Sequence, residues 1–153
     1  MFRGLNNINV DAKGRLAIPT SLRTVLRESS DGKLVVTIDT QERCLLLYPL
    51  PEWEEVQAVL MKKPNMDEST RRLQRLLIGY ANDVEMDGQG RILIPQHLRD
   101  YADIGKKATL VGQSNKFEVW SETAWTERRD KWLMEIEMST DQPASDNLSD
   151  LSI

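Results

Sequence analysis

The feature of this sequence that most constrains its fold is a turn motif that occurs twice, 76 residues apart. The first copy begins at Asp11 and the second at Asp87, and both read Asp-x-x-Gly-Arg, then a short apolar run, then Pro. In both copies Leu-Arg follows three residues after the Pro. A motif repeated together with its flanking pattern indicates an internal duplication, so the chain is expected to fold as two similar halves.

Each copy predicts the same local structure. Apolar residues alternate along the chain ahead of the turns: Ile8 and Val10, then Val84 and Met86. An Asp carboxylate can accept backbone N–H groups across a turn, and Gly adopts a positive φ without steric cost. Two strands around such a turn predict a β-hairpin. Pro19 and Pro95 then suit the first turn of a helix, so each copy reads as strand, tight turn, strand, helix.

The similarity continues beyond the motif, because residues 43–48 align with residues 115–120 and Trp53 aligns with Trp125. A chain of 153 residues is a typical length for one domain. Half of it would have only a thin core of its own. We therefore expect a mainly β, α+β fold in which the two copies share one core as a pseudo-dimer within the chain.

The same patterns give a predicted organisation of the chain. The predicted segments are a first repeat with its trailing helix at 1–62, a linking helix at 63–80, a second repeat with its trailing helix at 81–138, and an acidic flexible tail at 139–153. The predicted helices cover 19–27, 51–62, a segment ending near 79, and 121–138, and the strands after the turns cover 34–38, 44–48, 106–112 and 117–120. The tail is rich in Ser and Asp and has no aromatic residue, which is typical of a mobile segment.

The net charge of −4 argues against nucleic-acid binding until its distribution is considered. Residues 133–153 contain five acidic and no basic residues, whereas residues 1–30 contain five basic and two acidic ones. A local basic face of this kind is compatible with DNA binding. The sequence shows no signal peptide and no apolar run long enough for a membrane span, and its single cysteine, Cys44, fits a reducing compartment, so a cytoplasmic protein is expected.

The residue inventory argues against an enzyme. His97 is the single histidine, Cys44 has no partner at catalytic spacing, and no phosphate-binding loop or nucleophile elbow is present. Asp11 and Asp87 could pair across a pseudo-twofold axis as acid and base or as metal ligands. Turn formation accounts for both aspartates without chemistry, so no cofactor, metal or small-molecule substrate is expected.

These residues resemble the MraZ family over roughly the first 130 residues. The features that carry the resemblance are Met1-Phe2-Arg3-Gly4, the two Asp-x-x-x-Arg motifs, Cys44-Leu45-Leu46-Leu47-Tyr48-Pro49, and Val111-Gly112 with Phe117-Glu118-Val119-Trp120. The resemblance implies two AbrB-like (SpoVT-type) halves that form a double-split β-barrel. It also implies a nucleoid-associated bacterial transcriptional regulator that acts on the promoter of its own division and cell-wall operon. Ring-shaped homo-oligomers, octamer or dodecamer, and binding to G-rich direct repeats are further implications.

A physical mechanism for DNA recognition follows from the motif. Arginine can form a bidentate pair with O6 and N7 of guanine, and Lys13 and the N–H of Gly14 would hold phosphates. The candidate contacts to double-stranded DNA are Arg3, Lys13, Gly14, Arg15, Gln89 and Arg91. Asp11 and Asp87 would brace the turns and orient the arginines without touching DNA.

The two copies differ in charge. The first turn carries Lys13, and Arg3 is expected near it, whereas the second has Gln89 at the matching position and follows the acidic pair Asp83 and Glu85. We therefore expect the first repeat to contribute more of the DNA contact. The second repeat would contribute less, or mainly assembly.

Two other interpretations stay open. The Asp and Arg of each motif are four residues apart and could simply pair to stabilise the turn. The chain could also be an antitoxin-like protein-interaction module that uses its acidic C-terminal tail after Met138, because AbrB-like folds also occur in antitoxins.

Overall fold

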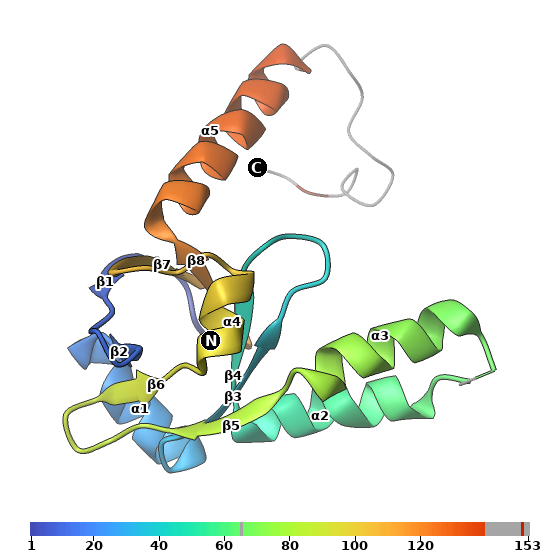
Figure 1. Ribbon diagram of the computed structural model, residues 1–153, viewed down its shortest axis with the longest axis horizontal. Helices are drawn as coiled ribbons and strands as arrows, with labels where there is room; N and C mark the ends of the chain where they lie inside the picture. Colours follow the sequence, from blue (N-terminus) through green and yellow to red (C-terminus); the bar gives the residue numbers. More distant parts are fainter. Residues whose placement is uncertain (65, 140–150, 152–153) are drawn as a thin grey trace. The chain divides into compact units, whose positions relative to one another are not determined.

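A computed structural model describes residues 1–64, 66–139 and 151 of the chain. The chain divides into two units, Met1–Glu122 and Thr123–Ile153, and the first unit contains both turn motifs. The elements of the first unit, in chain order, are β1 (Leu5–Asn9), β2 (Arg15–Ala17), α1 (Thr20–Ser30), β3 (Lys33–Ile38), β4 (Leu45–Pro49), α2 (Leu50–Lys62), α3 (Glu68–Gly79), β5 (Asn82–Glu85), β6 (Arg91–Leu93), α4 (Gln96–Tyr101), β7 (Lys107–Gly112) and β8 (Phe117–Ser121). The helix α5 (Glu122–Met138) starts where the first unit ends (Figure 1).

Strands from both repeats are combined within each sheet of the first unit. A six-stranded antiparallel sheet has the order β1-β7-β8-β4-β3-β5, and β2 pairs with β6 in a separate two-stranded ribbon. The first repeat's β1 pairs with the second repeat's β7, and the second repeat's β5 pairs with the first repeat's β3. This exchange confirms the predicted α+β class and the intrachain pseudo-dimer.

The predicted hairpins form only next to the turns. Around the first turn, the antiparallel pairing is limited to the bridge between Val10 and Leu16 and the hydrogen bond from Asp11 N–H to Arg15 O (3.0 Å), and β2 pairs along its length with β6. The strands β2 and β6 are each three residues long, which is too short to bury the central apolar residue on a local hairpin. Pairing the twin strands places Leu16 opposite Ile92, and both side chains are completely buried.

The core lies between the six-stranded sheet and the β2–β6 ribbon. It is built from equivalent positions of both repeats, so neither repeat encloses it alone. Its fully buried members include Leu16, Ile18, Leu26, Leu34, Leu47, Ile92, Ile94, Leu98, Leu110 and Phe117. Each short helix after the ribbon contributes one of these side chains, Leu26 from α1 and Leu98 from α4.

The prolines mark the starts of these short helices. Pro19 and Pro95 are the N-cap residues of α1 and α4, and their backbone is extended (ψ 140° and 145°). Each proline therefore lies just before the first helical residue, whereas the sequence predicted it within the first turn of the helix. Proline suits this position because it lacks an N–H and the residue before a helix needs an extended backbone.

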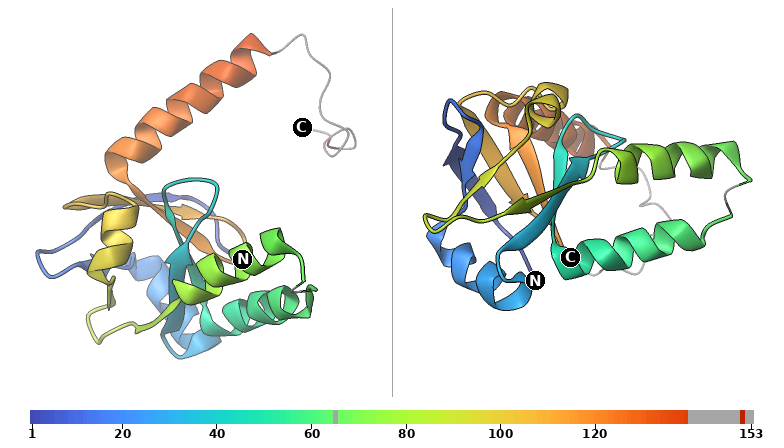
Figure 2. Two further views of the ribbon diagram at one scale, coloured as in Figure 1. Left: turned by 45° about the vertical axis from the view of Figure 1, so that its right-hand side comes forward. Right: turned by 60° about the horizontal axis from the view of Figure 1, so that its bottom comes forward.

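The antiparallel pair α2 and α3 packs on the other face of the sheet. Trp53 of α2 joins Val35, Leu46 and Tyr48 in a second buried cluster. Figure 2 shows this helical pair extending from the sheet on the side away from the β2–β6 ribbon. Across the described ranges, each helix is too short or too polar to cross a lipid bilayer.

Candidate nucleic-acid interface

The two turn motifs lie at opposite ends of the β2–β6 ribbon and are joined across the repeats. Ile94 N–H donates to Gly14 O at 3.0 Å, and Ile18 N–H donates to Gly90 O at 2.9 Å. Gly14 and Gly90 both have positive φ, +92° and +76°. The ribbon and its two turns therefore form one continuous element with one strand from each repeat.

In the first turn, Asp11 accepts hydrogen bonds from the backbone and from the arginine. Its Oδ1 accepts from the backbone N–H of Lys13 (3.0 Å) and of Arg15 (2.9 Å), and its Oδ2 accepts from Arg15 Nε at 2.7 Å. The hydrogen bond from the Arg15 backbone is the largest cause that lowers the pKa of Asp11, to about 2. The carboxylate is therefore anionic at neutral pH.

The second turn repeats this arrangement. Asp87 accepts from the backbone N–H of Gln89 and of Arg91, both at 2.9 Å, and from Arg91 Nε at 3.3 Å. The hydrogen bond from the Arg91 backbone is the main cause that lowers the pKa of Asp87. A group with a lowered carboxyl pKa is a poor general acid or base near neutral pH, which argues against an acid–base pair of Asp11 and Asp87.

Arg15 and Arg91 lie on the outer face of the ribbon. Because Leu16 and Ile92 point into the core, the flanking pairs of the register, Arg15 with Leu93 and Ala17 with Arg91, point outward. Asp11 binds Arg15 through Nε, and within the described part of the chain the terminal nitrogens of Arg15 have no hydrogen-bond partner. Asp11 thus orients the guanidinium through Nε, while the terminal nitrogens of Arg15 stay available.

Two further arginines support the turns, although the turn motif alone predicts no role for them. Arg23 Nε donates to Ile18 O at 2.8 Å, and Arg99 Nε donates to Ile94 O at 3.0 Å. Each guanidinium packs against the glycine of the other repeat, Arg99 against Gly14 and Arg23 against Gly90. The signal that could have found them was the Leu-Arg pair at the same place in both copies.

Two of the expected DNA contacts have surroundings that differ from those predicted. The N–H of Gly14 donates to Asp11 O at 3.0 Å, and Gly14 is buried, so this N–H is already hydrogen-bonded within the turn. Arg3 lies at the other end of β1 from the first turn, where Gly4 O accepts from the backbone N–H of Gly112. The strand β1 has five residues and is about 17 Å long, so it separates Arg3 from the first turn. The expected proximity of Arg3 to this turn is therefore wrong. Lys13 and Gln89 are exposed on their turns.

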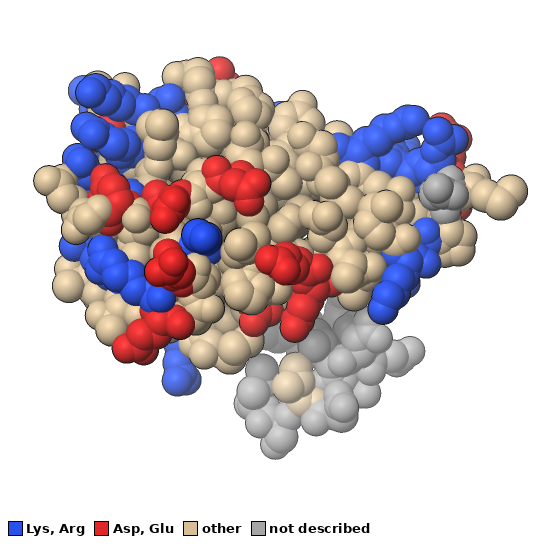
Figure 3. All heavy atoms as spheres, turned by 90° about the horizontal axis from the view of Figure 1, so that it is seen from below, with Lys and Arg blue, Asp and Glu red and all other residues tan. Residues whose placement is uncertain are grey.

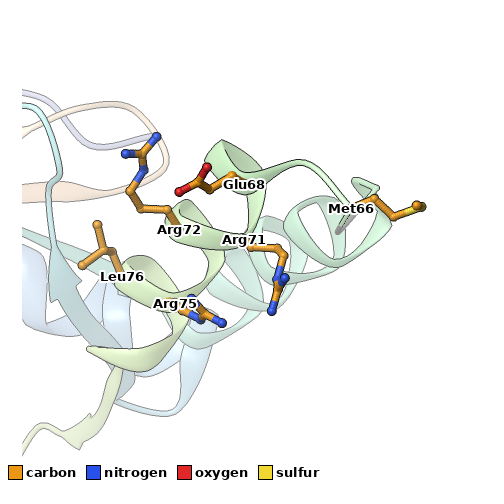
Figure 4. Close-up of a pocket in the computed structure, with 6 residues that line it drawn as sticks. All are labelled: Met66, Glu68, Arg71, Arg72, Arg75 and Leu76. Atoms are coloured by element: carbon orange, nitrogen blue, oxygen red, sulfur yellow. The ribbon is translucent and has the colours of Figure 1, made fainter.

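The helix α3 carries a separate group of arginines. Figure 4 shows Arg72 on the same side of the helix as Glu68, whereas Arg71 and Arg75 point to another side. Figure 3 shows blue side chains over the α2–α3 pair at the right, apart from the mixture of blue and red over the turns at the left. Because these arginines are exposed and divided between faces, we interpret them as a solvated helix surface.

Among the described residues, one group of three potential metal ligands comes together: Asp39, Cys44 and Glu118, with ligand atoms within 4.8 Å of one another. Burial, followed by the charge of Glu118, raises the pKa of the Cys44 thiol, which donates to Asp39 Oδ2 at 3.6 Å. Glu118 accepts from Trp120 Nε1 at 3.0 Å. These internal hydrogen bonds account for the cluster as packing, so we assign it no metal.

Comparison with known proteins places the chain in a class. A family model described as "MraZ protein, putative antitoxin-like" matches it twice, at residues 1–76 and 77–150. The relative from Thioalkalivibrio sulfidiphilus, named transcriptional regulator MraZ, is 53% identical over 145 residues, which cover 95% of each chain. Relatives of the same name from Methylococcus capsulatus (53% over 138 residues, 90% of each chain) and Hydrogenovibrio crunogenus (49% over 152 residues, 99% of this chain and 98% of the relative) also match.

The fold and these relatives define a transcriptional regulator with two tandem repeats. The chain belongs to the MraZ family. Its members carry the name of a regulator and not of an enzyme, which confirms the expectation drawn from the residue inventory.

Proposed function

We propose that this regulator recognises G-rich direct repeats in double-stranded DNA upstream of its own division and cell-wall operon. The observation that carries the proposal is the position of Arg15 and Arg91 on the outer face of the β2–β6 ribbon, each oriented by an aspartate of its own turn. The operon and the G-rich repeats come from the family resemblance. The ribbon supplies a physical way to read them.

The ribbon has a suitable size for the major groove. That groove is about 12 Å wide and admits a two-stranded β-ribbon. A guanidinium held through Nε presents its terminal nitrogens to O6 and N7 of a guanine, which is a common specific contact. Ala17 and Leu93, which share the outer face, offer apolar surface to thymine methyl groups.

Contacts to phosphates would fix the ribbon in the groove without reading sequence. Lys13 is exposed on the same turn as Arg15 and is the first candidate. Gln89 occupies the equivalent position of the second turn and can offer only a neutral hydrogen bond. Arg23 and Arg99 act as positioning residues, because their guanidinium groups pack against the turn glycines.

One ribbon buries too little surface for tight binding, so we propose that a homo-oligomeric ring multiplies the contact. A second ribbon on the same rigid ring would bind at a high effective concentration once the first is bound. Direct repeats spaced by about one helical turn, roughly 10 base pairs, would present equivalent groove faces to neighbouring subunits. An octamer or dodecamer that associates with the nucleoid in the cytoplasm is the assembly suggested by the family resemblance.

The test is a fluorescence-anisotropy titration with a duplex from the upstream region of the chain's own gene and a shuffled duplex of equal length. Arg15→Ala should lower the preference for the upstream duplex about 5- to 140-fold, because a bidentate guanine contact is worth about 1–3 kcal/mol of discrimination. Arg72→Ala, which removes an exposed arginine of α3, is the matched control and should change the preference less than twofold.

Two results would overturn the proposal. One is a folded wild-type protein that binds both duplexes equally. The other is an Arg15→Ala variant that melts at a lower temperature yet keeps the full preference, which would show that Arg15 only pairs with Asp11.

The antitoxin-like alternative has one observation in its favour, the description of the matching family model. Its predicted partner-binding segment, the tail at 139–153, lies outside the described residues except for Ser139 and Leu151. A pull-down with the full chain and with a chain ending at Met138 would test it, and loss of a bound protein on truncation would favour it.

A further inference from the structure

A groove of about 550 Å³ borders the first turn, and residues of both repeats line it. The first repeat contributes Asn9 to Ala12, and the second contributes Arg99 and the segment from Ile104 to Lys107. We infer that this groove is a binding site for DNA phosphates, in which Lys106 and Lys107 of the second repeat hold the backbone beside the first turn. The inference rests on the proposed function and adds residues that the turn motif does not contain.

Strand pairing fixes the two lysines relative to the first turn. In the register of β1 with β7, Asn9 lies opposite Lys107, and the backbone N–H of Val10 donates to Lys106 O at 2.9 Å. The next pair, Ile8 with Ala108, is buried, so the side chains of Asn9 and Lys107 point outward. The groove is therefore attached directly to the segment that leads into Asp11.

Both lysines carry charge that the protein does not neutralise by a direct pair. They are exposed, and within the described ranges neither makes an ion pair. The nearby carboxylate of Asp11 already pairs with Arg15 at 2.7 Å. A lysine ammonium is a compact point charge on a flexible stem, which suits a phosphate oxygen better than a base edge.

The equivalent position beside the second turn has one lysine in place of two, and that lysine faces a glutamate. There the backbone N–H of Met86 donates to Gly32 O at 2.8 Å, so Gly32 replaces Lys106. Lys33 replaces Lys107, but it lies opposite Glu85 in the register of β3 with β5, where the first turn has neutral Asn9. Asp31, the residue before Gly32, is acidic. Arg27 is a basic group beside the second turn, and its Nη2 donates to Asp87 O at 3.3 Å. The pseudo-symmetry of the backbone is thus kept, while the adjacent lysine pair lies beside the first turn.

Because of this difference, we assign phosphate binding to the groove beside the first turn. The lysines come from the repeat opposite to the turn that they flank, so phosphate binding at the first turn would need both halves of the chain. Phosphate contacts also release counterions, which makes affinity depend on salt with a slope of about 0.9 per neutralised phosphate. The slope therefore measures whether the lysines touch the DNA backbone.

The test compares the full-length wild-type protein with the double variant Lys106→Gln/Lys107→Gln. The control double variant Lys62→Gln/Lys63→Gln removes the same charge at the end of α2, on the far side of the sheet. Affinities for the upstream and the shuffled duplex are measured at several salt concentrations. We expect the groove variant to reduce the slope by about 1 to 2 and to weaken both duplexes by the same factor, while the control keeps the wild-type slope.

Three outcomes would overturn the inference. An unchanged slope would show that the lysines do not meet phosphates, and a changed ratio between the duplexes would show that they read bases. An equal slope change in the control would show a general charge effect. Arg15→Ala separates this inference from the proposed function. If Arg15→Ala abolishes the preference for the upstream duplex while the groove variant keeps the wild-type salt slope, the phosphate site is refuted and the proposed function stands. A wild-type protein that binds neither duplex would overturn both.

Discussion

The guanidinium of Arg99 packs against Gly14, so a residue of the second repeat holds the turn of the first repeat in place. The backbone completes this support, because Arg99 Nε donates to Ile94 O while Ile94 N–H donates to Gly14 O, both at 3.0 Å. The equivalent contact of Arg23 with Gly90 supports the second turn. The Asp-x-x-Gly-Arg motif and the Leu-Arg pair that follows it are therefore parts of one structure that the two repeats build together.

Gly14→Ala should destabilise the protein through this contact. Gly14 has φ +92°, and an added Cβ would lie 2.5 Å from Arg99 Cζ. We expect the free energy of unfolding to fall by about 1–3 kcal/mol from backbone strain, with a further loss from displacing Arg99. Urea denaturation followed by circular dichroism measures the change.

Gly4→Ala provides the matched control. Gly4 has a similar φ of +98°, but an added Cβ there meets no atom within 4 Å. The difference between the two variants isolates the clash with Arg99. Equal losses would contradict a supporting role for Arg99.

Asp11→Asn should alter the acid limb of the stability curve. Folding lowers the pKa of Asp11 from 3.8 to about 2, first through the hydrogen bond from the Arg15 backbone. A lowered carboxyl pKa stabilises the folded state above the unfolded pKa, and this stabilisation is lost as the pH falls from about 4 to about 2.

The variant should therefore be less stable than the wild type at neutral pH, and the two should converge near pH 2. Urea denaturation at a series of pH values checks this, with Asp83→Asn, at an exposed aspartate of β5, as the control. A stability difference that stays constant from neutral pH to pH 2 would contradict the assignment.

Most elements could be predicted from the sequence, because local patterns determine them. The helix predicted at 51–62 is observed at Leu50–Lys62, and the strand predicted at 44–48 is observed at Leu45–Pro49. The partner of β2 could not be predicted in this way. Alternating apolar residues and a turn glycine are equally compatible with a local hairpin and with a strand exchanged between repeats, and only the shared core decides between them.

The site shows the same division. The duplicated motif identified Asp11, Arg15, Asp87 and Arg91 as one kind of turn, because motif spacing is local information. The distance of Arg3 from the first turn depends on the register of β1 with β7, which no motif encodes. The supporting arginines belong to a repeated Leu-Arg pair, but their contacts cross between the repeats and depend on the three-dimensional fold.

Leu16→Ala and Ile92→Ala should test whether the ribbon couples the two repeats. The two residues are a cross-strand pair and both are completely buried. Each variant should lower the free energy of unfolding by about 2–5 kcal/mol, because a large apolar side chain leaves a cavity in the shared core. In the double variant we expect a non-additive term of about 0.5–3 kcal/mol. Strict additivity, or two separate unfolding transitions, would indicate repeats that fold independently.

Arg15→Ala should weaken sequence-specific DNA binding more than Arg91→Ala. Arg91 lies between two carboxylates, with Nε 3.3 Å from Asp87 Oδ2 and Nη1 3.9 Å from Asp11 Oδ2, whereas Arg15 pairs with Asp11 alone. A guanidinium between two anions must give up more protein contact to meet a guanine.

The neighbouring charges act in the same direction, because the first turn carries Lys13 and the second carries Gln89. Anisotropy titrations of both variants against the upstream and shuffled duplexes measure the asymmetry, and urea denaturation of the same samples measures the structural part. We expect Arg91→Ala to show the smaller loss of preference, because part of its role is to hold the two turns together. Equal losses of preference at equal stability would instead mean that both ends of the ribbon read DNA alike, and the charge difference between the turns would then have no part in recognition.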